Sequence, residues 1–357
     1  MRSLYRNLIF SFLAIASIVS EAVAQTAAKR LFGSKPLPAQ LQPAAHGFYT
    51  KGCLAGGIAI PVDGPNWQAM RLSRNRRWGH PDLIRIIEEL SYKAKRDGWN
   101  GLMVGDISQP RGGPMLTGHR SHQIGLDADI WFNPMPTRRL TYAERENISA
   151  VSVLKSGSVY VDKKRWTRAH TMVLYHAASF PQVERVLVHP GVKKQLCDTV
   201  KGNRKWLNKI RPIWGHHYHF HIRIGCPEGS TGCKPQKPTG SNTGCNDGSL
   251  DWWFNVEFNP NKKKPKPPAK PVKPTKRREL LLGDLPNACK MVIAAEAPNL
   301  ETATYRPIDK EFSAPNVPIP AFSAERVIKG KPIEAAAAAI TSITSQKIPV
   351  PKKRPIR

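Results

Sequence analysis

Apolar and polar positions follow regular patterns along the middle of the chain. In HPDLIRIIEELSYKAKRDG, residues 80–98, apolar side chains recur three and four positions apart, after a proline and before a glycine. This spacing predicts an amphipathic helix. TRAHTMVLYHAASF, residues 167–180, predicts a second helix, and VERVLVH, residues 183–189, predicts a strand.

Two further segments alternate between polar and apolar residues, which predicts strands with two different faces. In LDADIWF, residues 126–132, Asp127 and Asp129 share one face. In HYHFHIRI, residues 217–224, the shared face carries three imidazoles: His217, His219 and His221. Because helices and strands come in mixed order, without a regular strand–helix–strand rhythm, we predict an α+β fold.

Composition divides the chain into regions. Residues 1–24 begin with two arginines, continue into the apolar run LIFSFLAIASIV and lead into AVAQ. These features predict a secretory signal peptide that is cleaved after Ala24. A membrane anchor is the alternative, but the run is shorter than the roughly 20 apolar residues that span a bilayer. Residues 25–45 then form a short polar segment.

Residues 46–256 have the mixed composition of a folded domain and contain all eleven histidines. Residues 257–357 turn to Lys, Pro and Ala, a composition that buries too little apolar surface to offset the entropy of ordering. We therefore predict that this tail is mostly disordered. Within it, EAAAAAI at 334–340 predicts a transient helix, and Cys289 could tie the tail back to the domain.

The formal net charge is +29, which attracts polyanions over a long range. Residues 261–278 carry nine basic side chains and no acidic one, so part of this charge belongs to the tail. In an exported protein the polyanions within reach belong to the cell envelope, and no motif indicates nucleic-acid binding. We expect the basic tail to contact anionic envelope components and expect no nucleic-acid partner.

Export also changes how the six cysteines are interpreted. An even number of cysteines in an oxidising compartment favours disulfides, and the chain has no C-x-x-C pair that would indicate a thiolate zinc site. Six cysteines allow 15 pairings. Cys226 and Cys233 are close enough in sequence to close a single loop.

The candidate chemistry begins in HRSHQIGLDADIW, residues 119–131, where two histidines and two aspartates surround an apolar core. Buried charge is costly unless it is paired or bound to a metal. Catalytic zinc sites use three protein ligands and leave a fourth position for water. His122 and Asp129 could supply two ligands, with Gly125 allowing a bend, and His221 could supply the third from the second alternating segment.

These motifs resemble those of the LAS metallopeptidases, a group of peptidoglycan peptidases with the patterns H-x6-D and H-x-H. The resemblance is closer to the penicillin-insensitive murein endopeptidases, because WGHPDL at 78–83, VGD at 104–106, GHRSHQIGLDADIW and HFHIRIGCP are all similar to that subfamily. It extends from about residue 46 to Cys289. It implies a central antiparallel sheet with flanking helices, a periplasmic location and zinc as the cofactor.

The resemblance also implies roles for single residues. It implies zinc ligation by three of them: His122, Asp129 and His221. It implies that His219 and His216 are active-site histidines, and His119 falls on a further histidine of the pattern. Asp127 could be another ligand, or it could accept a hydrogen bond that fixes the tautomer of a ligand histidine; we favour the second interpretation.

The cysteine pairing of the family implies three disulfides: Cys53–Cys289, Cys197–Cys245 and Cys226–Cys233. One departure concerns a second metal site of the family, which uses an Asp and a His between the two motifs. This chain has Ser156 and Val159 there. We therefore expect one zinc ion, with a second site doubtful.

Three other polar residues near the motifs have weaker assignments. We expect His80 to support the start of the first helix, and His217 to be an exposed neighbour of the site. Asp106 could orient a ligand histidine or begin a turn.

We expect a zinc-dependent murein DD-endopeptidase that hydrolyses the D-alanyl–meso-diaminopimelyl cross-links between stem peptides. Penicillin should not inhibit it, because this chemistry needs no serine nucleophile that a β-lactam could acylate. One alternative is a zinc D,D-carboxypeptidase or dipeptidase that trims free stem peptides. Another is a non-catalytic basic protein that binds the cell wall.

Overall fold

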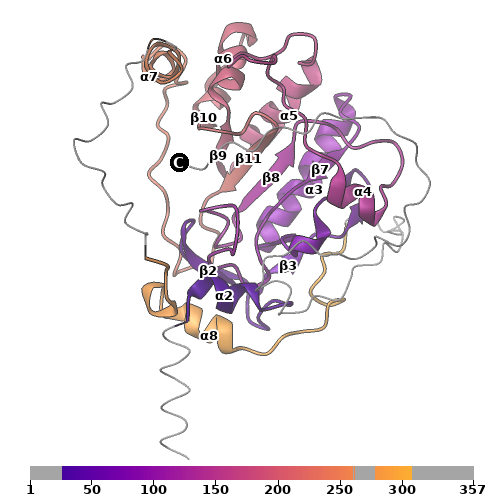
Figure 1. Cartoon of the computed structure of the whole chain (residues 1–357), viewed down its shortest axis with the longest axis vertical. Coiled ribbons are helices and arrows are strands. Elements are labelled where there is room, and N and C mark those ends of the chain that lie inside the picture. The colour runs from indigo at the N-terminus through magenta and orange to yellow at the C-terminus, as the bar shows by residue number, and fades with distance from the viewer. Residues whose placement is uncertain (1–25, 260, 262–277, 308–357) are drawn as a thin grey trace, which may run out of the picture.

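The computed structural model describes residues 26–259, 261 and 278–307 (Figure 1). Three predicted features lie outside the described residues: the signal peptide at 1–24, almost all of the basic run after 261, and the helix at 334–340. Among the described helices, none combines the length and the apolar character that a membrane span requires.

A seven-stranded sheet with the order β10-β9-β11-β8-β7-β5-β4 forms the centre of the protein. Its strands are β4 (Asp63–Gly64), β5 (Trp67–Ala69), β7 (Leu102–Val104), β8 (Asp127–Trp131), β9 (Val183–Val188), β10 (Ile210–Pro212) and β11 (His219–Ile224). The four middle strands, β9, β11, β8 and β7, are antiparallel. Parallel pairs lie outside them, β10 with β9 and β5 with β7. The predicted α+β class is confirmed, and the antiparallel arrangement applies to the middle of the sheet and to the edge pair β4 and β5.

Three longer helices accompany this sheet: α3 (Pro81–Arg96), α5 (Arg168–Ser179) and α6 (Pro190–Thr199). The two predicted helices are α3 and α5, and the predicted strand is β9. As expected, His80 supports the start of α3, because its Nδ1 accepts a hydrogen bond from the backbone N–H of Asp82 at 3.3 Å. Pro81 at the first helical position already has the backbone angle that a helix needs.

The shorter elements complete the fold. They are the helices α2 (Ala28–Gly33), α4 (Tyr142–Asn147), α7 (Ser249–Trp252) and α8 (Ala288–Ala294), the 3₁₀ turns η1 (Leu72–Arg74), η2 (Lys205–Lys209) and η4 (Leu282–Asp284), the π turn η3 (Trp253–Glu257), and the strands β1 (Ala44–Phe48), β2 (Lys51–Ala55), β3 (Ile58–Ala59) and β6 (Trp78–Gly79). In Figure 1, α2 and α8 lie together at the end of the protein opposite α6 and α7.

The main core follows from the alternation in β8 and β11. Ala128 and Ile130 of β8 and Phe220 and Ile222 of β11 are fully buried in one cluster with apolar side chains of α3 and α5. The polar residues of both strands therefore lie on the other face. They are buried as well.

The prediction of a mostly disordered tail after residue 257 is wrong for residues 278–307. In that segment Cys289 and Val292 of α8 are buried in a second core with Phe32 of α2. Further along, Ala303 is buried and Tyr305 donates its backbone N–H to the carbonyl of Ala59. A few apolar residues and one disulfide are enough to hold this segment against the domain.

The short polar segment at 25–45 is also part of the fold, because it contains α2 and the start of β1, which pairs with β2. The three disulfides that the family resemblance implies are all present: Cys53–Cys289, Cys197–Cys245 and Cys226–Cys233. The first joins β2 of the domain to α8, and so ties the segment at 278–307 to the domain.

Candidate active site

The register of β8 and β11 brings the predicted site residues together. His221 lies directly opposite Asp129, and Arg223 lies directly opposite Asp127. Residues opposite one another in an antiparallel pair project from the same face of the sheet. The Nδ1 atom of His221 consequently lies 3.1 Å from Oδ1 of Asp129.

His122 reaches the same place from the loop before β8. Its backbone is in the left-handed region at φ 67°, and Gly125 follows at φ 70°, so the loop bends as the glycine suggested. The backbone N–H of His122 donates to Oδ2 of Asp127 at 2.9 Å, and its Nδ1–H donates to the carbonyl of Ile107 at 2.5 Å. The second nitrogen, Nε2, therefore carries the lone pair and lies 3.5 Å from Oδ1 of Asp129.

Asp127 supports this arrangement from beneath. Its Oδ1 accepts hydrogen bonds from Nε2 of His221 at 2.8 Å and from Nε of Arg223 at 2.7 Å. A proton on Nε2 leaves the Nδ1 lone pair of His221 facing Asp129. Burial disfavours ionisation of Asp127, but Arg223 and His221 outweigh it and hold the pKa of the carboxyl far below its usual range. The oxygens of Asp127 are thus engaged in hydrogen bonds with its neighbours. This agrees with the interpretation that Asp127 fixes the tautomer of a ligand histidine.

Two buried atoms at the centre have no hydrogen-bond partner: Nε2 of His122 and Oδ1 of Asp129. Burial disfavours the Asp129 carboxylate, yet His219 and His122 hold its pKa well below the usual value. Unpartnered buried polar atoms are costly, and a divalent cation would satisfy both. The nitrogen and oxygen donors present therefore fit a metal ion.

His119 also reaches this centre. Within the described residues, His119, His122 and Asp129 form a group whose ligand atoms all lie within 4.8 Å of one another. However, Nε2 of His119 lies 3.0 Å from Oδ2 of Asp106. The same Nε2 lies 3.5 Å from Oδ2 of Asp129, and a proton shared with Asp106 would deprive it of its lone pair, so His119 offers this nitrogen to a metal only if it releases Asp106.

The other undecided residue, Asp106, follows β7 and contacts a histidine directly. Its Oδ2 accepts from Arg74 and Arg76, each at 3.0 Å, besides contacting His119. Although Asp106 is buried, His119 and Arg76 hold its pKa far below the usual range. Asp106 therefore orients a histidine of the site, whereas the sequence left this role undecided.

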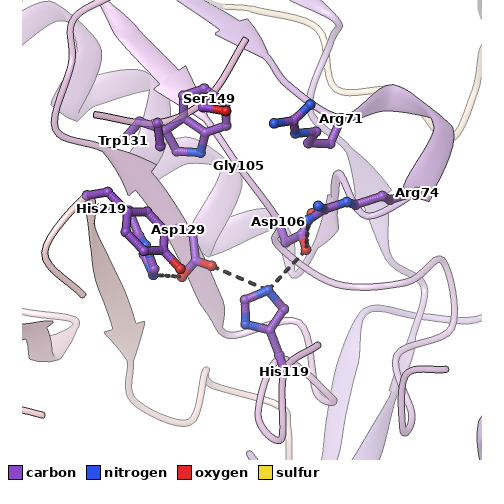
Figure 2. A pocket seen from close by; sticks show the side chains of 11 residues that line it. Arg71, Arg74, Gly105, Asp106, His119, Asp129, Trp131, Ser149 and His219 are labelled. Atoms are coloured by element: carbon purple, nitrogen blue, oxygen red, sulfur yellow. Dashed lines mark hydrogen bonds and ion pairs between the residues drawn. The ribbon is translucent and has the colours of Figure 1, made fainter. Parts of the chain in front are cut away.

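A pocket of about 320 Å³ opens beside these residues (Figure 2). His219 lines the pocket, and its Nε2 lies 3.6 Å from Oδ1 of Asp129. His216 lies behind it, with the two imidazole centres 4.7 Å apart, and its Nδ1–H donates to the carbonyl of Trp214 at 2.8 Å. Burial, followed by the neighbouring His219, lowers the pKa of His216 to about 4.

His217 does not lie where the sequence suggested. Expected to be exposed, it is half-buried; its Nδ1 bonds the hydroxyl of Ser152 at 2.9 Å and its ring packs edge-on against His189. Because β11 begins only at His219, the alternation does not extend back to His217.

Several pocket residues carried no signal that the sequence alone made specific. Arg71 and Arg74 line the side of the pocket opposite His219 (Figure 2), and Trp131 and Tyr218 are also among its lining residues. The basic run RLSRNRR at 71–77 precedes the WGHPDL motif and could have drawn attention. That two arginines of this run line the pocket is shown only by the folded chain.

Buried imidazole nitrogens and a carboxylate that converge beside a pocket define the protein as a candidate metal-dependent hydrolase. Comparison with known families is more specific. Residues 45–294 match the model of the family described as penicillin-insensitive murein endopeptidase. The chain therefore belongs to this family.

Relatives with the name penicillin-insensitive murein endopeptidase are similar over most of their length. One from Haemophilus influenzae is 39% identical over 227 residues, which cover 61% of this chain and 77% of the relative. One from Klebsiella pneumoniae is 35% identical over 228 residues, covering 64% and 81%. One from Salmonella paratyphi B is 35% identical over 236 residues, covering 65% and 85%.

Proposed function

We propose that this protein is a periplasmic, zinc-dependent murein DD-endopeptidase that hydrolyses D-alanyl–meso-diaminopimelyl cross-links between peptidoglycan stem peptides. The observation that carries the proposal is the pair of buried, unpartnered atoms, His122 Nε2 and Asp129 Oδ1, beside the lone pair of His221 Nδ1. Family membership and the names of the relatives support the substrate. The predicted signal and the disulfides support the location.

In this proposal His122, Asp129 and His221 hold the zinc ion. When bound, zinc supplies a Lewis acid for the scissile carbonyl and lowers the pKa of bound water to about 7. The carbonyl of Ile107 and the carboxylate of Asp127 keep the two histidines in the tautomers that ligation needs.

The other histidines act on the proton and on the leaving group. His219 lines the pocket and faces Asp129, so it is placed to receive a proton from the attacking water and return it to the departing amine. His216 packs against His219 and fixes its ring from behind. Since no serine nucleophile takes part, β-lactams have no residue to acylate.

The test is cleavage of purified cross-linked muropeptide dimers by the mature chain, with and without a chelator. We expect cleavage that a chelator abolishes and added zinc restores. His122→Ala and His221→Ala should each lose bound zinc and activity, whereas His176→Ala, a histidine of α5 that pairs with Asp97, should keep both. Intact dimers in the presence of zinc and wild-type protein would rule out the proposal.

The same assay separates the carboxypeptidase alternative. Loss of a single alanine from monomeric stems, with dimers left intact, would show trimming in place of cross-link cleavage. A wall-binding protein without activity would release no product from either substrate.

A further inference from the structure

The pocket has a second polar wall that the proposed hydrolysis does not use. Arg71 and Arg74 line it, across from Asp129 and His219 (Figure 2). Both arginines come from the turn η1 and the residue before it, between β5 and β6. The pocket is therefore bounded on one side by the candidate ligand Asp129 with His219, and on the other by guanidinium groups.

Positive charge is in excess on this wall. The Oδ2 atom of Asp106 is shared by Arg74, Arg76 and His119, each at 3.0 Å, so one carboxylate faces several cationic or donor groups. Arg71 makes no ion pair with a carboxylate of the described residues. One arm of its guanidinium donates to the carbonyl of Ile148 at 2.8 Å, and the group lies 5.7 Å over the ring of Trp131.

Arg71 is also held where a cation is costly. Burial, followed by the charge of Arg74, lowers its pKa from the ordinary value. An anion in the pocket would relieve both effects, because it would replace lost hydration and offset the repulsion between the two guanidinium groups.

The backbone of this turn is strained in the same way as that of the candidate site. Among the described residues, four that are not glycine have a left-handed φ: Arg71 at 55°, Asn75 at 51°, His122 at 67° and His216 at 54°. Two of these belong to the metal and histidine cluster, and the other two flank η1. Such strain persists where surrounding contacts enforce it and concentrates at functional sites.

The contacts that enforce the turn come from α4 and from β6. Glu146 accepts hydrogen bonds from both the backbone N–H and the hydroxyl of Ser73, at 2.9 and 2.7 Å. Asn75 accepts from the indole N–H of Trp78 at 2.7 Å. These contacts hold the backbone of the turn from which Arg71 and Arg74 extend.

We propose that Arg71 and Arg74 form a carboxylate subsite, which binds the free carboxylate of the diaminopimelyl residue next to the scissile amide. This inference rests on the proposed function. In diaminopimelate, the amino group acylated by D-alanine is attached to a carbon that also bears a carboxylate. An amide placed beside Asp129 and His219 therefore carries an anion toward the opposite wall, where guanidinium groups can pair with it.

The test compares two cross-linked dimers that differ only in this carboxylate, free in one and amidated in the other. Steady-state kcat and KM are measured with zinc for the wild type, Arg71→Gln and Arg74→Gln. Arg85→Gln serves as the matched control, because Arg85 is about as exposed as Arg74 and pairs with Asp82 on α3. Thermal melting of each variant checks that it is folded.

We expect the wild type to prefer the free-carboxylate dimer by roughly tenfold to a hundredfold in kcat/KM. Each Arg→Gln change at the subsite should lower kcat/KM for that dimer about tenfold more than for the amidated dimer, mainly through KM. Arg71→Lys, which keeps the charge but loses the planar fork, should lose less than Arg71→Gln. If Arg71→Gln does not fold, Arg74→Gln decides the test, because the Arg74 side chain is half-exposed and its replacement should be tolerated.

Equal cleavage of both dimers by the wild type, or equal losses on both dimers in the variants, would overturn the subsite and leave the proposed hydrolysis intact. If the wild type cleaves neither dimer, the proposed function has failed. Calorimetric binding of the two dimers to the wild type then tests the carboxylate subsite. Tighter binding of the free-carboxylate dimer that Arg74→Gln abolishes would support the subsite. Equal binding of the two would reject it.

Discussion

At the scale of single residues, Asp127 shows how a buried carboxylate can serve a site without facing the pocket. It accepts hydrogen bonds from the backbone of His122, the ring of His221 and the guanidinium of Arg223. These contacts hold one loop and one strand in a common geometry. The orientation of both histidines therefore depends on one side chain that is fully buried.

Asp127→Asn tests this role. The amide would turn an NH₂ group toward donors and would no longer balance the charge of Arg223, so the proposed zinc affinity and kcat/KM should fall by about 10- to 100-fold. Competition with a chelator measures the affinity. Asp198→Asn, an exposed carboxylate that pairs with Lys194 on α6, is the control and should change neither quantity. Unchanged zinc affinity in Asp127→Asn would contradict the role.

Gly125 is a second residue on which the loop of His122 depends. Its φ is 70°, and a Cβ atom there would lie 2.6 Å from a methyl of Leu54 and 3.1 Å from the backbone nitrogen of His80. Gly157 has a φ of 71° but open space around it. The two glycines therefore separate the cost of the backbone conformation from the cost of the clash.

Gly157→Ala should lower the free energy of unfolding by about 1–2 kcal/mol, the usual cost of a left-handed conformation for a residue with a Cβ. Gly125→Ala should cost more and should also reduce activity, because the clash displaces the loop that carries His122. Urea denaturation together with the muropeptide assay measures both effects. Equal losses of stability in the two variants would show that the clash is relieved at no cost.

At the scale of elements, the edge of the sheet is fixed by a buried ion pair. Arg145 of α4 and Asp63 of β4 are both fully buried, with Nη2 and Oδ1 2.7 Å apart. Arg145 also donates to the carbonyls of Leu140, Val62 and Ala69. The same helix holds the turn η1 through Glu146, so the pair supports the arginine wall of the pocket indirectly.

Arg145→Met should destabilise the protein by about 3–5 kcal/mol, because it leaves the buried carboxylate of Asp63 without its main partner. Arg85→Met breaks an exposed pair with Asp82 and should cost less than about 1 kcal/mol. Urea unfolding followed by tryptophan fluorescence compares the two variants. Similar losses in both would mean that water reaches Asp63 in the native state.

At the scale of the whole molecule, the described C-terminal segment returns to the N-terminal one. Besides the disulfide between Cys53 and Cys289, Arg111 donates to the carbonyls of Val292, Ile293 and Ala295 at the end of α8. Two residues after Arg111, Gly113 donates its backbone N–H to the carbonyl of Gln123, the residue that follows His122. Closure of the chain therefore stabilises the side of the fold from which the site loop emerges.

Replacing both Cys53 and Cys289 by alanine should lower the free energy of unfolding by about 2–5 kcal/mol. The loss should exceed that caused by replacing Cys226 and Cys233, because the first pair is 236 residues apart in sequence and the second only 7. Denaturation under non-reducing conditions measures the difference. A larger loss from the short loop would contradict the importance of chain closure.

Truncation gives a second test at this scale. A chain that ends after residue 307 should keep its activity on soluble muropeptides, since it retains every residue of the candidate site and every contact among the described residues. A chain that ends after residue 290 loses most of α8 and the carbonyls that bind Arg111, and should melt at a lower temperature. Equal melting temperatures for the two chains would show that the returning segment adds no stability.

Much of the fold could be predicted because its signals are local. Helix α3 follows from apolar spacing between a proline and a glycine, and the two site strands follow from strict alternation. His217 was misjudged because alternation does not reveal where a strand begins. The fold of residues 278–307 was missed because composition averages over a few buried apolar side chains and a distant disulfide partner.

The sequence by itself determined the α+β class, the two histidine and aspartate motifs and the family resemblance. Each of these depends on short segments of neighbouring residues, which a local pattern describes. Only the tertiary structure decided that Asp106 forms a hydrogen bond with His119. It also decided that Arg71 and Arg74 lie across one pocket from Asp129 and His219. Those contacts join segments far apart in the chain. Their geometry depends on strand register and loop conformation, which no local pattern encodes.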